Sequence, residues 1–132
     1  IIHAGDFCSP YTAFPFKDIE IPLVGVFGNN DGDKINLREK FNNIGEIFDY
    51  ANIIEIGEGS KILLTHYPDL VDSLAKSGDY DFVIYGHTHE LDIRKVKGTQ
   101  IINPGALSGH ISNSPTFLIV DTVSTDKEVF SI

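Results

Sequence analysis

The sequence predicts an α/β fold, a mixed two-sheet β-sandwich with helices on its outside. Two helix candidates stand against eight or nine strand candidates in 132 residues, a length that suits one domain with its own hydrophobic core. Helical segments separate the first strands, which favours parallel pairing there. Short turns join the last strands, which favours antiparallel pairing in that part of the chain.

The first half of the chain alternates apolar runs with turn residues. Strands are predicted at 1–4 and 22–27, because both runs are apolar and stop at a glycine. Pro10 and Pro15 interrupt the stretch between these strands, which is predicted as a loop or broken helix. A helix is predicted over 36–44, with apolar residues spaced by four and three and an N-cap before them: Leu37, Phe41, Ile44 and the cap Asn36.

The second half is richer in strand signals. A hairpin is predicted from 53–56 and 61–64, around the turn at 57–60. A helix is predicted over 69–76, with Asp69 as its cap and Ser77-Gly78 as its end. Further strands are predicted at 82–86, 91–96, 100–102, 115–120 and 127–130.

Composition and charge narrow the possible functions. Hydrophobic residues make up 42% of the chain, which predicts a folded protein. The net charge of −9 argues against nucleic-acid and anionic-membrane binding, and it is compatible with bound cations. A single cysteine, Cys8, excludes an intrachain disulfide, and no apolar run reaches membrane-spanning length. We therefore expect a cytoplasmic protein, for which a homodimer is the common oligomeric state.

The stretch after the predicted strand 82–86 gives the main functional signal. Gly86 is followed by His87, Thr88 and His89, so two histidines stand two residues apart. If the chain stays extended there, both imidazoles leave from one side and can hold a transition metal. The simpler alternative is that they are strand-end histidines bonded to neighbours or to water.

Four predicted strands end in the same way, with a metal-capable side chain just beyond the apolar run. These side chains are Asp6, Asn29, His66, and then His87 with His89. Each motif alone is ordinary turn chemistry, but carboxyl ends of parallel strands converge on one crevice. Oxygen and nitrogen donors together suit Mn, Fe, Ni, Co or Zn. Five donors exceed the needs of a single tetrahedral zinc, and a carboxylate can bridge, so a pair of metals fits better.

These motifs, in this order, resemble those of the calcineurin-like metallophosphoesterases, and especially the small prokaryotic YfcE-like phosphodiesterases. The resemblance rests on the following stretches and covers the whole chain: Gly5-Asp6, Gly28-Asn29-Asn30-Asp31, Thr65-His66, Gly86-His87-Thr88-His89 and Asn103-Pro104-Gly105. It implies an enzyme that hydrolyses a small phosphate-ester substrate, most simply a phosphodiester. A hydroxide bridging two divalent metal ions, Mn above all, would attack phosphorus.

The resemblance also implies roles for individual residues. Asp6 would bridge the two metals, Asn29, His66 and His87 would bind one of them, and His89 would bind the other. Asn103 and Gly105 would contact the substrate.

Asn30 and Asp31 are the expected catalytic residues. Asn30 stands where many relatives have a histidine, and an amide cannot transfer a proton at neutral pH. Asp31 is expected to hold Asn30. We therefore expect a preference for phosphodiesters and good leaving groups over unactivated monoesters. His110 is a candidate for the missing acid, against the alternative of a solvated loop histidine.

One motif of the family, Asp-x-His, is not present in the sequence. It would belong to a βα unit of roughly 30 residues before Ile1. We expect this N-terminal unit to be missing from the given sequence, so that the chain is a truncated single domain, 1–132, that binds one metal weakly and lacks a central strand.

Two other functions fit parts of the pattern. The retromer subunit of this fold keeps a Gly-His-Thr-His stretch as a non-catalytic protein-binding scaffold, but here Asp6 and Asn29 are also kept. Metallo-β-lactamase-type zinc hydrolases open with His-x-His too. They need Asp-His soon afterwards, whereas Glu90-Leu91-Asp92-Ile93 follows in this chain.

Overall fold

The computed structural model describes residues 1–57, 59–108 and 114–132, so the candidate acid His110 lies outside the described residues. Three helical segments are present in the described part: the 3₁₀ helix η1 (Pro10–Phe16) and the α-helices α1 (Lys34–Phe41) and α2 (Val71–Ser77). The strands are β1 (Ile2–His3), β2 (Leu23–Val26), β3 (Gly45–Phe48), β4 (Ala51–Ile56), β5 (Ser60–Thr65), β6 (Phe82–Ile84), β7 (Leu91–Val96), β8 (Thr99–Pro104), β9 (Thr116–Val120) and β10 (Lys127–Ser131).

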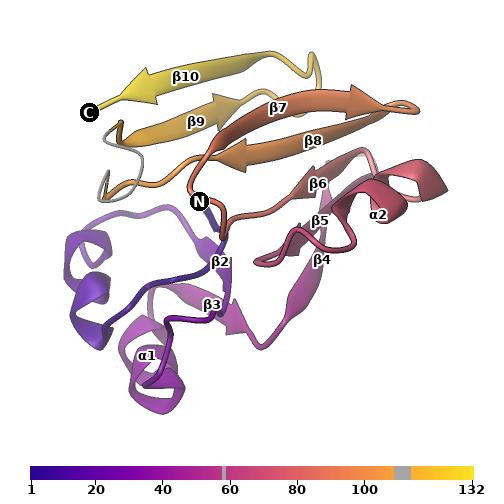
Figure 1. Ribbon diagram of the computed structural model, residues 1–132. Coiled ribbons are helices and arrows are strands. Elements are labelled where there is room, and N and C mark those ends of the chain that lie inside the picture. Colours follow the sequence, from indigo (N-terminus) through magenta and orange to yellow (C-terminus); the bar gives the residue numbers. More distant parts are fainter. Residues whose placement is uncertain (58, 109–113) are drawn as a thin grey trace.

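Hydrogen bonding groups the described strands into three sheets (Figure 1). The order β1-β2-β3 is wholly parallel, and the mixed five-stranded sheet has the order β4-β5-β6-β8-β7. β9 and β10 form a separate antiparallel pair, with β10 at the top of Figure 1. The expected parallel first part and antiparallel last part are confirmed. The expected number of two sheets is wrong among the described strands, because no ladder joins β1-β2-β3 to β9-β10.

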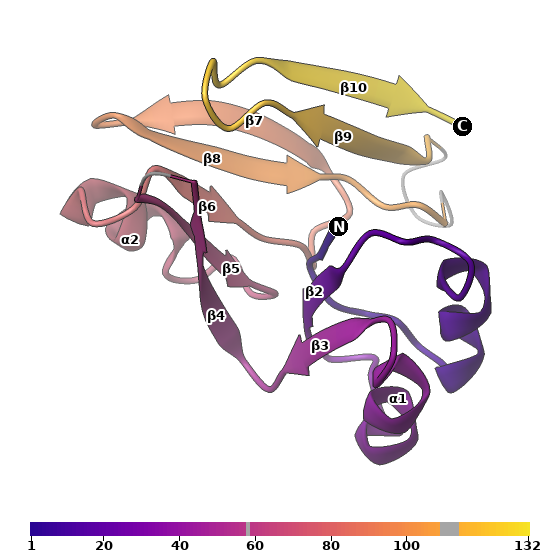
Figure 2. The same cartoon turned by 180° about the vertical axis from the view of Figure 1, so that it is seen from behind.

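Apolar side chains cover both faces of the five-stranded sheet. On one face α2 packs through Val71 and Ala75 onto strand residues such as Val83. The opposite face of the sheet packs against β1 and β9. The residues at this contact are Ile62, Phe82, Ile102, Ile2, Leu118 and Val120. Figure 2 shows the molecule from behind. α2 therefore lies outside a layered pair of β structures, as the fold class predicts.

The parallel sheet β1-β2-β3 has its own helical cover. Leu37 and Phe41 of α1 pack with Phe7, Leu23 and Ile47, all buried in one cluster. α1 also contacts η1, so both helical segments lie on the same part of the molecule. The result is an α/β protein whose helices lie on the outside of its sheets.

The helix boundaries correct two expected caps. α1 begins at Lys34 after Asp33, and Asn36 lies within the helix, where its side-chain amide donates to the Asp33 carboxylate at 2.9 Å. α2 begins after Leu70, which replaces Asp69 as the N-cap residue, because the Leu70 carbonyl accepts the helical bond from the Leu74 N–H at 2.9 Å. Its predicted end is confirmed by Gly78, which adopts φ +79°.

Among the described strands, β3 alone was not predicted from the sequence. Its burial pattern has only Ile47 fully buried, so there is no clear alternation to detect. Its pairing with β2, Val24 with Glu46 for example, spans more than twenty residues and is decided by tertiary structure. In the described part of the chain, no helix is long and apolar enough to cross a membrane.

Candidate metal centre

The predicted site residues follow the carboxyl ends of four strands. Asp6 comes soon after β1, Asn29 after β2, His66 directly after β5, and His87 three residues after β6. β1 is parallel to β2 and β5 is parallel to β6, while β2 contacts β5 across the two sheets. The strand ends therefore meet at one edge, as expected for ligand sites in parallel sheets.

Four of the predicted side chains lie against one another. The Asn29 Oδ1 atom is 2.9 Å from His66 Nε2 and 2.8 Å from His87 Nδ1. The two histidine nitrogens are 3.3 Å apart, and Asp6 Oδ1 is 3.6 Å from His66 Nε2. Groups separated by up to 81 positions thus form one cluster, which we call the donor cluster: Asp6, Asn29, His66 and His87.

The hydrogen bonds of His66 show that the donor cluster suits a cation. Its Nδ1 lies 2.7 Å from the Ala4 carbonyl oxygen, which can only accept, so Nδ1 carries the proton. In the neutral ring Nε2 then presents a lone pair, and it faces the lone pairs of Asn29 Oδ1. A divalent cation between such atoms satisfies both, and the Ala4 bond fixes the ring as outer-shell partners of metal ligands do.

The Asp6 carboxylate is held by Asn30. The backbone N–H of Asn30 donates to Asp6 Oδ1 and its side-chain amide donates to Oδ2, both at 2.9 Å. Asp6 itself adopts φ +60° after Gly5 at φ +98°, so the turn is held in the left-handed region. Asn30 therefore orients the carboxylate that would bridge the metals.

Asp31 does not hold Asn30, so that expected role is wrong. Its buried carboxylate accepts backbone N–H bonds from Asp6 at 3.0 Å, Cys8 at 2.8 Å and Gly28 at 2.7 Å. Asp31 therefore fastens the loop after β1 to the loop after β2. The sequence offers no signal for this contact, because its partners are backbone groups.

His89 lies in the same loop as His87 but is placed differently. The chain does not stay extended after Gly86, since His87 has φ +70° and His89 has φ +61°. The two imidazoles therefore do not leave from one side of a strand. His89 Nδ1 is buried without a hydrogen-bond partner in the described structure.

No three histidine, cysteine, aspartate or glutamate side chains form a complete metal site within the described ranges. The donor cluster includes three such side chains, Asp6, His66 and His87, and the Asn29 amide oxygen lies against the two histidines. Metal binding by His89 stays a prediction.

A model of the calcineurin-like phosphoesterase superfamily domain matches residues 1–125. The chain belongs to this superfamily. It is 37% identical over 126 residues to phosphodiesterase MJ0936 of Methanocaldococcus jannaschii, a match that covers 92% of this chain and 75% of that protein. This homology confirms that the chain is an enzyme of the superfamily. It excludes the alternative that the chain is a metallo-β-lactamase-type hydrolase.

Solved structures agree with this assignment. A characterised archaeal phosphodiesterase superposes with a TM-score of 0.91 at 34% identity, covering 99% of this chain and 81% of that one. Vacuolar protein sorting 29 from Cryptosporidium parvum superposes with a TM-score of 0.66 at 22% identity, covering 98% and 78%. The second likeness shows a shared fold only.

Asn103 of this phosphoesterase is not available to a substrate, contrary to expectation. Its side chain is fully buried, and its amide donates to the Gly86 carbonyl at 3.0 Å and to Thr88 Oγ1 at 2.9 Å. Its Oδ1 accepts the Gly105 N–H at 3.0 Å, so the backbone donor of Gly105 is used as well. Asn103 therefore holds the loop that carries His87, and Gly105 in turn holds the side chain of Asn103.

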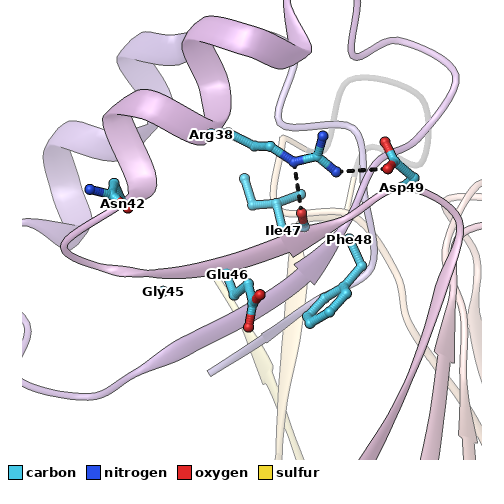
Figure 3. Close-up of a pocket in the computed structure, with 7 residues that line it drawn as sticks. All are labelled: Arg38, Asn42, Gly45, Glu46, Ile47, Phe48 and Asp49. Carbon is cyan, nitrogen blue, oxygen red and sulfur yellow. Dashed lines mark hydrogen bonds and ion pairs between the residues drawn. The ribbon is translucent and has the colours of Figure 1, made fainter.

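Two hollows on the phosphoesterase lie away from the donor cluster. Figure 3 shows one of 350 Å³ between α1 and β3, where Arg38 bonds to the Ile47 carbonyl and to Asp49. Because its guanidinium is engaged and Glu46 and Asp49 add negative charge, this hollow does not suit a phosphate ester. A second, of 370 Å³, is lined by Ala51, Asn52, Ile53 and Leu63 and holds no titratable group.

His3 supports the Gly5-Asp6 turn from inside the fold. Its Nδ1 accepts the Gly5 N–H at 3.2 Å, and its ring stacks on Phe7 with centroids 3.8 Å apart. Burial lowers the pKa of His3 to about 4, although the nearby carboxylates of Asp31 and Asp6 oppose the shift. His3 is therefore a neutral acceptor at physiological pH.

Proposed function

We propose that this chain hydrolyses phosphodiesters with the help of two divalent metal ions. The supporting observation is the donor cluster, in which His66 Nε2 lies 2.9 Å from Asn29 Oδ1 while its Nδ1 is fixed by the Ala4 carbonyl at 2.7 Å. Members of the superfamily typically bind metals, and the homology to a phosphodiesterase supports the reaction type.

Asn29, His66 and His87 would hold one metal, Asp6 would be shared, and His89 would serve the other. Mn is the first candidate, since carboxylate, amide and imidazole donors together suit it, and Ni, Fe, Co and Zn are alternatives. When bound, such ions lower the pKa of water towards neutrality and neutralise charge on phosphoryl oxygens.

Asn30 and Asp31 would orient the metal ligand Asp6, and Asn30 would also restrict which leaving groups the substrate can have. Asn30 fixes both oxygens of Asp6, and Asp31 fixes the backbone on either side of it. Because Asn30 cannot donate a proton to a leaving group, we propose that substrates with good leaving groups are preferred.

The first measurement is metal binding, by calorimetry with MnCl₂ on the wild type and on Asp6→Asn and His66→Ala. We expect each variant to bind Mn at least about 10-fold more weakly than the wild type. Asp121→Asn is the matched control, since Asp121 is exposed and its carboxylate accepts from the backbone N–H groups of Val123 and Ser124 in its own turn. Equal affinity in all four proteins would overturn the assignment of ligands.

The second measurement is hydrolysis of bis(4-nitrophenyl) phosphate and 4-nitrophenyl phosphate with and without EDTA. We expect hydrolysis of the diester to exceed that of the monoester, to stop with EDTA and to fall with Asp6→Asn. Metal binding without any hydrolysis would instead favour a protein-binding scaffold, the function we weighed against the enzyme.

A further inference from the structure

Two tyrosines extend the site beyond the metal-binding side chains. The rings of Tyr50 and Tyr67 stack with centroids 5.6 Å apart and an interplanar angle of 30°. Tyr50 follows the carboxyl end of β3, which runs parallel to β2, and Tyr67 directly follows His66 at the end of β5. Both tyrosines therefore lie at the strand edges where the donor cluster is built.

Tyr67 connects this pair to the donor cluster. Its ring meets His66 edge-on, with centroids 5.0 Å apart at 87°, and lies 5.7 Å from the ring of His87. A continuous row of rings thus runs from the proposed metal ligands through Tyr67 to Tyr50.

Tyr50 ends the row in solvent. Its side chain is 64% exposed, whereas Tyr67 is half-buried between it and the histidines. An aromatic ring that is fixed by a neighbour and still largely exposed offers a flat apolar surface for another ring. The donor cluster consists of carboxylate, amide and imidazole side chains. It holds no lysine or arginine side chain that could select a substrate by pairing with its negative charge.

We infer that Tyr50 and Tyr67 form a stacking platform that selects phosphodiesters with a flat aromatic group, such as a nucleobase, next to the scissile phosphate. The inference rests on the proposed function, because it assumes that the phosphate lies at the donor cluster. Stacking of a base on an exposed aromatic side chain strengthens binding by about 10-fold or more. The platform binds the group that does not react, so it should change KM more than kcat.

The test uses two substrates that differ only in the base. These are the 2,2,2-trifluoroethyl phosphodiesters of adenosine 5′-phosphate and of ribose 5-phosphate, with Mn present and the released trifluoroethanol measured by ¹⁹F NMR. We expect the wild type to show a KM about 10-fold lower for the adenosine ester. Tyr50→Leu should abolish that difference, and Tyr50→Phe, which keeps the ring, should retain it.

Tyr11→Leu is the matched control. Tyr11 is 74% exposed and also stacks on an aromatic ring, that of Phe14 at 5.7 Å, within η1. Its substitution should leave the KM ratio as in the wild type. A wild-type ratio near one, or a ratio unchanged by Tyr50→Leu, would overturn the platform while leaving the phosphodiesterase in place.

A binding measurement keeps the two proposals separate if no hydrolysis is seen. Adenosine 5′-monophosphate and ribose 5-phosphate are titrated by calorimetry into the wild type and Tyr50→Leu, with Mn present. Tighter binding of the adenosine compound that is lost in Tyr50→Leu supports the platform even where the proposed function fails. Equal binding of both compounds to the wild type refutes it.

Discussion

The Asp31 carboxylate accepts a 3.0 Å hydrogen bond from the backbone N–H of Asp6, 25 positions away. The same buried group also accepts from Cys8 and Gly28, so one side chain fixes the two loops that carry Asp6 and Asn29. Hydrogen bonds to a charged acceptor are the stronger kind, and a buried acceptor cannot be replaced by water without rearrangement. The proposed bridging carboxylate of Asp6 is thus positioned by a second carboxylate, that of Asp31, which acts through backbone groups.

Asp31→Asn should lower the free energy of unfolding by about 2 kcal/mol, because an amide group would face N–H donors that now meet a charged oxygen. It should also weaken Mn binding, since the Asp6 loop loses its anchor. Urea unfolding and calorimetry measure the two effects. Asp33→Asn is the control, since Asp33 is exposed and its carboxylate accepts from the exposed side chain of Asn36. Equal stability in the wild type and Asp31→Asn would contradict the anchoring role.

Gly28→Ala should damage the centre sterically. A Cβ atom there would lie 2.6 Å from the Asp6 nitrogen and 2.7 Å from His66 Cε1, so both ligands must shift. We expect a loss of about 1–3 kcal/mol in unfolding free energy and weaker Mn binding. Gly32→Ala, in the same loop, meets no atom within 4 Å and should change stability by no more than about 1 kcal/mol. Similar unfolding curves for the two variants would show that the close packing at Gly28 is unimportant.

Asn103→Ala distinguishes a structural from a substrate-binding role. Three hydrogen bonds to the Gly86–Thr88 loop and Gly105 are lost from a fully buried position. We expect the free energy of unfolding to fall by about 2 kcal/mol, measured in urea against the exposed control Asn42→Ala. An increase in KM with unchanged stability would instead restore the substrate contact that we have rejected.

The lowered pKa of His3 should make the free energy of unfolding depend on pH. Its pKa is about 4 in the fold and about 6.5 in the unfolded chain, so the unfolded state takes up the proton first as pH falls. Protonation of His3 therefore does not change the free energy of unfolding above pH 7. Between pH 6.5 and 4 it lowers that free energy by up to about 3 kcal/mol. His3→Asn keeps an acceptor for Gly5 without titrating, so it should lose less stability on acidification. Parallel pH profiles of unfolding free energy would exclude His3 as a cause.

The amino-acid sequence by itself determined the two α-helices, every described strand except β3, and the family. Short apolar runs that end in Gly5-Asp6, Thr65-His66 or Gly86-His87 are local signals, and so is the left-handed end of α2 at Gly78. The order of these motifs was sufficient to predict that Asp6, Asn29, His66 and His87 gather, because parallel strands bring their carboxyl ends to one edge.

Only the tertiary structure decided how those side chains are held. The Ala4 carbonyl sets the proton on His66, Asp31 binds backbone groups, and Asn103 is buried beneath the His87 loop. The division into three sheets, the pairing of β3 and the placing of Tyr50 beside Tyr67 belong here too. Backbone partners carry no residue-specific signal, and such contacts join segments far apart in the chain. Their geometry therefore depends on how the sheets pack, which local sequence does not encode.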